Sequence, residues 1–158
     1  MRTSFCIYTA TAIALITLSN AEEASPQPLL APSAQIPVPA LQGVWNAQTI
    51  EKDGKQAPTE AAKRMRFTFQ GDRLLITGNT SSDKEESCPY KVDSTKSPKQ
   101  LEFTPPKAGK PILSIYELTE DELKVCMRHA SSDKGRPTEF RTTPDSGLVL
   151  VVFKKQKQ

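Results

Sequence analysis

Apolar and polar residues alternate in several short stretches of the chain, most clearly in Met65-Arg66-Phe67-Thr68-Phe69. Such alternation is typical of a half-buried β-strand, because successive side chains of a strand point to opposite faces of the sheet. Met65, Phe67 and Phe69 are therefore predicted to face a core. The turn residues Gln70-Gly71-Asp72 follow and lead into a second apolar stretch at 73–77, which predicts a hairpin.

Similar short stretches, separated by turn residues about every eight to twelve positions, occur throughout the chain beyond residue 41. The stretches with strand character lie at 44–52, 65–69, 73–77, 88–92, 101–103, 112–118, 123–127 and 148–153. One short helix is expected near 59–64, where helix-forming residues follow Pro58. About eight strands and one short helix favour an antiparallel barrel or sandwich over a βαβ arrangement.

A closed barrel suits this pattern of strands better than an open sheet does. An open sheet of the same strands would leave two unpaired edges, and exposed edges promote aggregation. Pairing of the first strand with the last removes both edges. The predicted fold class is therefore all-β, an antiparallel barrel of about eight strands, whose interior is either filled by side chains or holds one small ligand.

The first 40 residues differ from this domain in composition. Residues 1–21 carry one early positive charge, an apolar stretch and then Ser19-Asn20-Ala21, which is the layout of a secretory signal peptide cleaved after Ala21. We therefore expect export to the extracellular space or periplasm, with no stable membrane span after cleavage. Residues 22–40 hold five of the thirteen prolines and are predicted to form a Pro-rich disordered spacer before a domain at 41–155 and a frayed tail at 156–158.

Charge and histidine content narrow the possible functions. Lys and Arg number 21 against 18 Asp and Glu, and a net charge of +3 is small for a dedicated nucleic-acid-binding protein. The single histidine, His129, excludes a multi-histidine metal site and has no catalytic partner in a recognisable motif. No nucleic-acid partner, metal or cofactor is expected.

Several motifs, in order and spacing, resemble those of one family. Gly43-Val44-Trp45 opens the first predicted strand, as Gly-x-Trp does in lipocalin-like barrels. The other matching stretches are Leu41-Gln42, Asp53-Gly54-Lys55, Phe67–Asp72, Tyr90–Asp93, Lys96–Lys99, Gly109-Lys110, Ile115–Leu118, Leu123–Cys126, Arg136–Phe140 and Ser146-Gly147. With them the domain resembles an uncharacterised family of secreted lipocalin-like domains expanded in Planctomycetes. The resemblance spans residues 41–155 and implies a lipocalin-like β-barrel, without an activity, cofactor or catalytic residue.

The resemblance also directs attention to Trp45. A tryptophan at this position plugs one end of a barrel with its large apolar area. The last strand lacks the arginine that stacks on this tryptophan in lipocalins, and Lys154 or Arg141 is the candidate replacement. The Thr-Asp-Tyr turn of lipocalins is also not present.

A set of apolar, mostly aromatic residues on the predicted strands is the candidate ligand site inside the barrel. Its members are Trp45, Phe67, Phe69, Leu75, Tyr90, Phe103 and Ile115. A hollow barrel lined by them is suited to a small apolar molecule. If they fill the interior instead, a structural or protein-interaction role remains.

Two further pairs of residues have alternative interpretations. Arg136 and Glu139 form either a ligand clamp at the barrel mouth or a surface ion pair with Phe140 packed inward. Cys88 and Cys126 form either a disulfide or two buried thiols. The disulfide is the less favoured alternative, because their strands are the fourth and seventh in order and the two side chains are expected on opposite faces.

These observations predict an exported, non-enzymatic binding module for an unknown small apolar molecule or a protein. The first alternative is a structural or protein-interaction domain with a filled core. The second is a hydrolase that uses carboxylates such as Glu117 or Glu139. Hydrolysis needs two titratable groups that converge in a pocket, and no motif in the sequence sets up such a pair.

Overall fold

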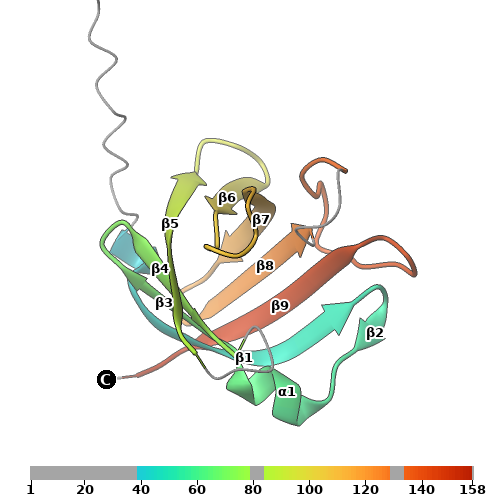
Figure 1. The fold of residues 1–158 in the computed structure, drawn as a ribbon, viewed down its shortest axis with the longest axis horizontal. Helices are drawn as coiled ribbons and strands as arrows, with labels where there is room; N and C mark the ends of the chain where they lie inside the picture. The colour runs from blue at the N-terminus through green and yellow to red at the C-terminus, as the bar shows by residue number, and fades with distance from the viewer. Residues whose placement is uncertain (1–38, 79–83, 129–133, 158) are drawn as a thin grey trace, which may run out of the picture. The chain divides into compact units, whose positions relative to one another are not determined.

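The computed structural model describes residues 39–78, 84–128 and 134–157, which form antiparallel strands and one short α-helix (Figure 1). The predicted signal peptide at 1–21, most of the predicted spacer and His129 lie outside these residues. Among the described residues, no helix has the length and hydropathy needed to cross a membrane.

The elements follow one another as a meander. Their bounds are η1 Pro39–Leu41, β1 Gly43–Lys52, β2 Lys55–Gln56, α1 Thr59–Arg64, β3 Arg66–Gln70, β4 Arg73–Thr77, β5 Glu86–Asp93, β6 Lys99–Phe103, β7 Ile112–Leu118, β8 Glu122–Arg128 and β9 Leu148–Lys155. Each strand from β3 to β9 pairs with the next, and β1 pairs with both β3 and β9. The result is a closed barrel of eight strands with β2 as an extra strand. The predicted all-β, lipocalin-like barrel and its helix at 59–64 are confirmed. The two-residue β2 was not predicted.

Strand β1 closes the barrel because it is long enough to pair with two neighbouring strands. Its first residues, Gly43–Asn46, pair with β3, and it pairs with β9 from Trp45 to Lys52. The register with β9 shifts between Ala47 and Thr49, which places a bulge at Gln48. A bulge bends a strand and increases its twist, and this bending helps a short sheet to close on itself.

Side chains alternate between the barrel interior and the outer face, as the sequence pattern predicts. Met65, Phe67 and Phe69 are buried in one core, to which η1 and all the remaining barrel strands also contribute. The other members are Leu41, Trp45, Ala47, Leu74, Ile76, Cys88, Tyr90, Leu101, Phe103, Tyr116, Leu123, Val125, Met127, Val151 and Phe153. The ring of Phe67 contacts three other aromatic rings, with centroid distances of 6.3 Å to Phe69, 5.9 Å to Phe103 and 4.6 Å to Phe153. These rings come from β3, β6 and β9, so aromatic side chains meet across the barrel at this level.

Two residues expected to line the interior lie on the outer face instead. Leu75 is half-buried and pairs with Thr68 and Ser87, whereas its neighbours Leu74 and Ile76 face the core. Ile115 is buried, but it pairs with the outward residues Gln100 and Cys126 and is not part of the core cluster. The prediction was wrong for both because 73–77 and 112–118 carry apolar residues on both faces, so alternation does not identify the inner one.

Trp45 closes one end of the barrel, as the Gly-x-Trp resemblance implies. Gly43 precedes it with a φ of +115°, a conformation that glycine adopts without strain, and this turn places η1 beneath the indole. The indole Nε1 donates a hydrogen bond to the Leu41 carbonyl at 2.8 Å. The cation over its ring is Lys155, with Nζ 5.3 Å from the centroid, and not Lys154 or Arg141. Lys155 pairs directly with Trp45 across β1 and β9, whereas Lys154 shares the outer face with Asn46.

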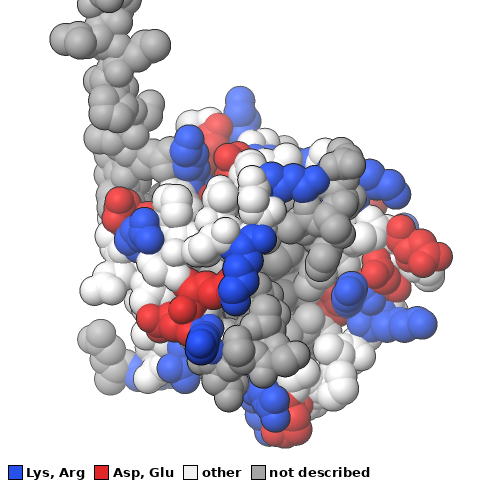
Figure 2. Space-filling model, in the orientation of Figure 1, with Lys and Arg blue, Asp and Glu red and all other residues white. Residues whose placement is uncertain are grey.

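Positive and negative side chains lie interspersed on the face of the molecule shown in Figure 2. Among the described residues, surface ion pairs join Lys154 to Asp121 at 3.1 Å and Lys63 to Glu60, both on α1, at 3.0 Å. This mixed surface agrees with the small net charge of the chain.

Replacement of the central aromatic residue tests the packed interior. Phe67→Ala is expected to lower the free energy of unfolding by about 3–5 kcal/mol, because it leaves a cavity among the three aromatic rings that Phe67 now contacts. Leu75→Ala removes an outward apolar side chain from the adjacent strand and is expected to cost about 1 kcal/mol. Urea denaturation followed by Trp45 fluorescence measures both. Equal losses in the two variants would contradict the assignment of inner and outer faces.

Candidate functional site

A segment of irregular structure, residues 134–147, crosses the outer face of the barrel between β8 and β9; we call it the strap. Beneath it Ile115 and Cys126 are 1% and 0% exposed although both point out of the barrel. A hydrogen bond with the Arg141 backbone reaches the Cys126 thiol, and Pro137 of the strap is itself buried. The strap therefore covers an apolar area on the outside of the barrel wall.

Arg136 anchors the first half of the strap. Its Nη1 donates to the carbonyl oxygens of Leu101 at 2.9 Å and Ser114 at 2.6 Å, which are paired residues of β6 and β7. Its Nη2 lies 3.2 Å from the carboxylate of Glu102. Arg136 thus pairs with Glu102 and not with Glu139, which is exposed. The predicted Arg136–Glu139 pair does not form, because the guanidinium is occupied by the barrel wall.

The second half of the strap is tied to the turn after β1. The hydroxyl of Thr142 donates a hydrogen bond to the carboxylate of Glu51 and accepts one from the Gly54 amide at 2.9 Å. The carboxylate of Asp53 accepts a hydrogen bond from the Gly147 amide at 2.7 Å. Both ends of the strap are therefore held by hydrogen bonds to the barrel, and Phe140 lies between them.

Phe140 forms one wall of a groove of about 430 Å³ at the rim of the barrel, where β7 ends. We call it the rim groove. Its lining residues are Lys96, Ser97, Pro98, Lys99, Tyr116, Glu117, Leu118 and Phe140. Tyr116 and Leu118 contact the core whereas Glu117 is exposed, so the groove straddles the edge of the barrel wall.

Two lysines lie close to aromatic rings of the rim groove. Lys99 Nζ lies 6.0 Å from the centroid of the Tyr116 ring, and Lys124 Nζ lies 5.9 Å from that of Phe140. Lys124 also pairs with the carboxylate of Glu117 at 3.2 Å. Burial raises the pKa of the Tyr116 phenol, and the negative charge of Asp93 raises it further. The groove therefore offers ammonium groups, a protonated phenol and apolar surface.

The residues predicted to line an internal site are instead engaged with one another. Phe69 and Tyr90 make an edge-to-face contact at 5.1 Å, and the Tyr90 hydroxyl donates to the Gly71 carbonyl at 2.9 Å. Gln42 donates a hydrogen bond to the same hydroxyl at 3.0 Å. Burial raises the pKa of Tyr90, so its phenol stays protonated. Tyr90 thus packs against core aromatics and helps to seal the end of the barrel near Trp45.

Both described cysteines are free and buried. Cys88 faces the core, whereas Cys126 faces outward beneath the strap, and the two belong to strands that are not neighbours. The structure thus corresponds to the two buried thiols and not to a disulfide. Burial raises the pKa of each thiol to about 11, so both are neutral thiols at physiological pH.

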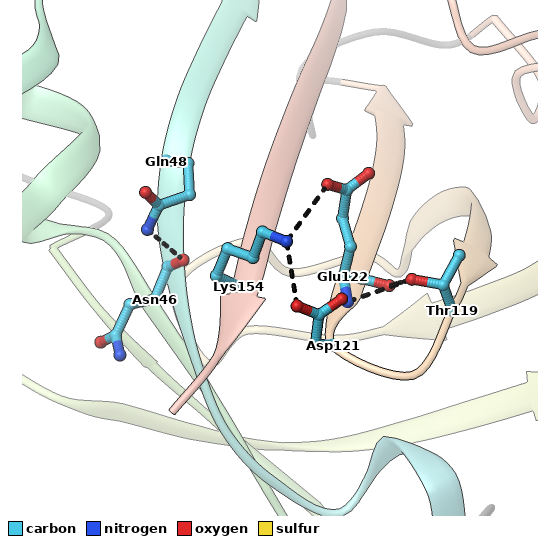
Figure 3. A network of polar contacts seen from close by, with 6 residues as sticks. All are labelled: Asn46, Gln48, Thr119, Asp121, Glu122 and Lys154. Atoms are coloured by element: carbon cyan, nitrogen blue, oxygen red, sulfur yellow. Dashed lines mark hydrogen bonds and ion pairs between the residues drawn. The ribbon is translucent and has the colours of Figure 1, made fainter. Parts of the chain in front are cut away.

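Figure 3 shows two further sets of polar contacts, one on β1 and one that joins Lys154 of β9 to the turn before β8 and the first residue of β8. Lys154 lies 3.1 Å from the carboxylate of Asp121 and 4.0 Å from that of Glu122. The hydrogen bond from Lys154 lowers the pKa of Asp121. On β1 the Gln48 side chain donates to the Asn46 carbonyl at 3.4 Å. These groups satisfy one another, and the rim groove is the better candidate site.

The carboxylates considered for hydrolysis have different surroundings. Glu117 lines the rim groove and is paired with Lys124, whereas Glu139 is exposed on the strap. Across the described ranges, no three His, Cys, Asp or Glu side chains are grouped so that they could hold a metal ion.

Only part of the rim groove could be predicted from the sequence. Lys96–Lys99 and Ile115–Leu118 stand out as motifs, and an inward-packed Phe140 is one of two alternatives for its segment. What unites them is the path of the strap, which depends on the contact of Arg136 with two carbonyls distant in sequence. Lys99 and Tyr116 are paired across β6 and β7, and this pairing brings two of the groove residues together. It can be predicted only when the register of these strands is known.

Comparisons with protein-family models, curated proteins and solved structures gave no match to this chain. The resemblance to the secreted family expanded in Planctomycetes therefore stays a prediction.

The anchoring role of Arg136 is testable by substitution. Arg136→Met is expected to lower the free energy of unfolding by about 2 kcal/mol, because it removes charge-assisted hydrogen bonds to two carbonyls. It should also increase amide hydrogen exchange across residues 134–147. Glu139→Gln, on the same strap, should change stability by no more than about 0.5 kcal/mol. A ligand clamp without structural role would show the opposite pattern: unchanged stability and exchange in Arg136→Met.

The buried thiols predict slow chemical modification. At pH 8, iodoacetamide should label Cys88 and Cys126 only after denaturation, because a pKa of about 11 leaves few reactive thiolates and burial blocks access. Peptide mass spectrometry scores the two sites separately from Cys6. Rapid labelling of the native protein, or a peptide that links Cys88 to Cys126, would contradict the assignment.

Proposed function

We propose that this chain is an exported, non-enzymatic binding module whose ligand occupies the rim groove and not the barrel interior. The observation that carries the proposal is the placement of Phe140 by the strap beside β7 and the 96–99 turn, which forms a groove of about 430 Å³. Grooves of this size with apolar walls and a few charged groups are typical of ligand sites.

The packing of the barrel supports a site at the rim. Phe67, Phe103 and Phe153 meet at centroid distances of 4.6 to 5.9 Å, so a ligand at this level would have to displace core side chains. Displacement of well-packed aromatic residues costs several kcal/mol. A rim groove needs no such displacement. This comparison supports the alternative of a protein-interaction domain with a filled core over carriage of a small apolar molecule.

The chemistry of the groove supports binding over catalysis. Its carboxylate, Glu117, is held in an ion pair with Lys124, and its phenol, Tyr116, has a pKa raised by burial. A hydrolytic pair needs one group that accepts a proton and another that donates it to the same substrate. An ion-paired carboxylate and a protonated phenol are better suited to hold a ligand in place.

Two further elements belong to this proposal. Export rests on the signal-peptide pattern of residues 1–21, and residues 22–40 would act as a tether that lets the domain reach a partner. The resemblance to the family expanded in Planctomycetes supports a secreted barrel of the same kind.

Mapping of small fragments by nuclear magnetic resonance tests the location of the site. We expect aromatic and carboxylate fragments to shift the signals of Tyr116, Leu118 and Phe140, because small molecules accumulate where apolar walls and charges converge. Signals of Phe67 and Leu74 should not move. Phe140→Ala should abolish the shifts, whereas Leu75→Ala, which removes an outer apolar side chain from β4, should preserve them. Fragments that shift interior residues, or none at the groove, would refute the proposal.

A further inference from the structure

The lysines of the rim groove include two that lack a carboxylate partner. Within the described part of the chain, neither Lys96 nor Lys99 forms an ion pair, whereas the groove carboxylate Glu117 is paired with Lys124, which lies outside the lining. The nearby carboxylate of Asp93 accepts hydrogen bonds from the amide and hydroxyl of Thr95, at 3.0 Å and 2.5 Å. Asp93 is thus hydrogen-bonded within its own loop, and the charge of Lys96 contributes to its lowered pKa without an ion pair between them. Both ammonium groups can therefore still pair with an anionic ligand.

The rest of the groove lining combines apolar side chains with Ser97 and with Glu117, whose carboxylate is paired with Lys124. Pro98 and Phe140 are half-buried, and Leu118 packs against the barrel core while it contributes to the lining. Lys124 above the Phe140 ring adds a cation to this wall. A complementary ligand must therefore combine negative charge with apolar groups.

We propose that the occupant of the rim groove is an extended acidic segment of a partner protein, in which Asp or Glu residues alternate with apolar residues. This inference rests on the proposed function. An extended peptide points successive side chains to opposite sides, so alternation presents carboxylates to Lys96 and Lys99 and apolar side chains to Phe140 and Leu118. Charge complementarity of this kind gives specificity and salt-sensitive binding.

A folded nucleic acid or a sulfated polysaccharide is a poorer match than an acidic peptide. Such polyanions bind to extended basic surfaces, in which many phosphates or sulfates are neutralised together. The groove itself presents two lysines, Lys96 and Lys99, and one carboxylate, Glu117, and positive and negative side chains are interspersed on the face shown in Figure 2. The groove also has apolar walls, which a polyanion without apolar groups leaves unfilled.

Titration of defined probes against the full chain tests the inference. The probes are a fluorescent peptide of alternating glutamate and leucine, a peptide of alternating lysine and leucine, and short-chain heparin. We expect the glutamate peptide to bind, with an affinity that falls as salt is added. The double variant Lys96→Gln/Lys99→Gln should weaken this binding about tenfold, as expected for loss of two exposed charge contacts. Phe140→Ala should weaken it to a similar extent.

The matched control is Lys52→Gln/Lys55→Gln, which removes two exposed lysines from the β1–β2 hairpin and changes the net charge equally. It should alter the affinity less than about twofold. Equal weakening in both double variants would overturn the inference, as would equal binding of the lysine peptide or tighter binding of heparin. If the glutamate peptide fails to bind while fragments still map to the groove, the inference fails and the proposed function stands. If fragments also miss the groove, both fail.

Discussion

Pairing between β1 and β9 is the interaction on which the rest of this structure depends. It joins the first barrel strand to the last from Trp45–Lys155 to Lys52–Val149 and thereby closes the sheet. Closure removes the exposed edges and divides the side chains of every strand into an inner and an outer set. It also places Lys155 over the Trp45 ring, which closes one end of the barrel. The connection from β8 to β9, the strap, contacts β6 and β7 through Arg136 and β1 through Thr142.

The strap explains why a small barrel with an aromatic core also has a groove at its rim. Aromatic rings from β3, β6 and β9 meet inside the barrel, so the interior serves as the core. The strap then buries a second, smaller apolar area at Ile115 and Cys126, and Arg136 anchors it to two carbonyls of the wall. Phe140 lies between this anchor and the Thr142 contacts, beside the end of β7. The proposed function thus assigns stability and recognition to different layers: the core inside, and the groove between the wall and the strap.

Local patterns in the sequence predicted the elements well and their long-range contacts poorly. The strand at 65–69 and the helix after Pro58 were predicted from patterns that extend over only a few residues, and both are confirmed. Ile115 was predicted to face the interior, but its strand is apolar on both faces. Its outward side chain is buried because the strap covers it. The cation over Trp45 is Lys155 because of the β1–β9 register, and Arg136 pairs with Glu102 because of the path of the strap. Register and path depend on contacts between residues far apart in sequence, and no local motif encodes them.

The central claim is that the closed barrel is filled, so that recognition takes place outside its core. A crystal of the protein held under xenon gas tests this most directly, because xenon enters dry apolar cavities without charge or hydrogen bonds. A filled interior predicts no xenon among Phe67, Phe103 and Phe153, whose rings are already in contact. Ordered xenon at that level of the barrel would show an internal cavity and would contradict the claim.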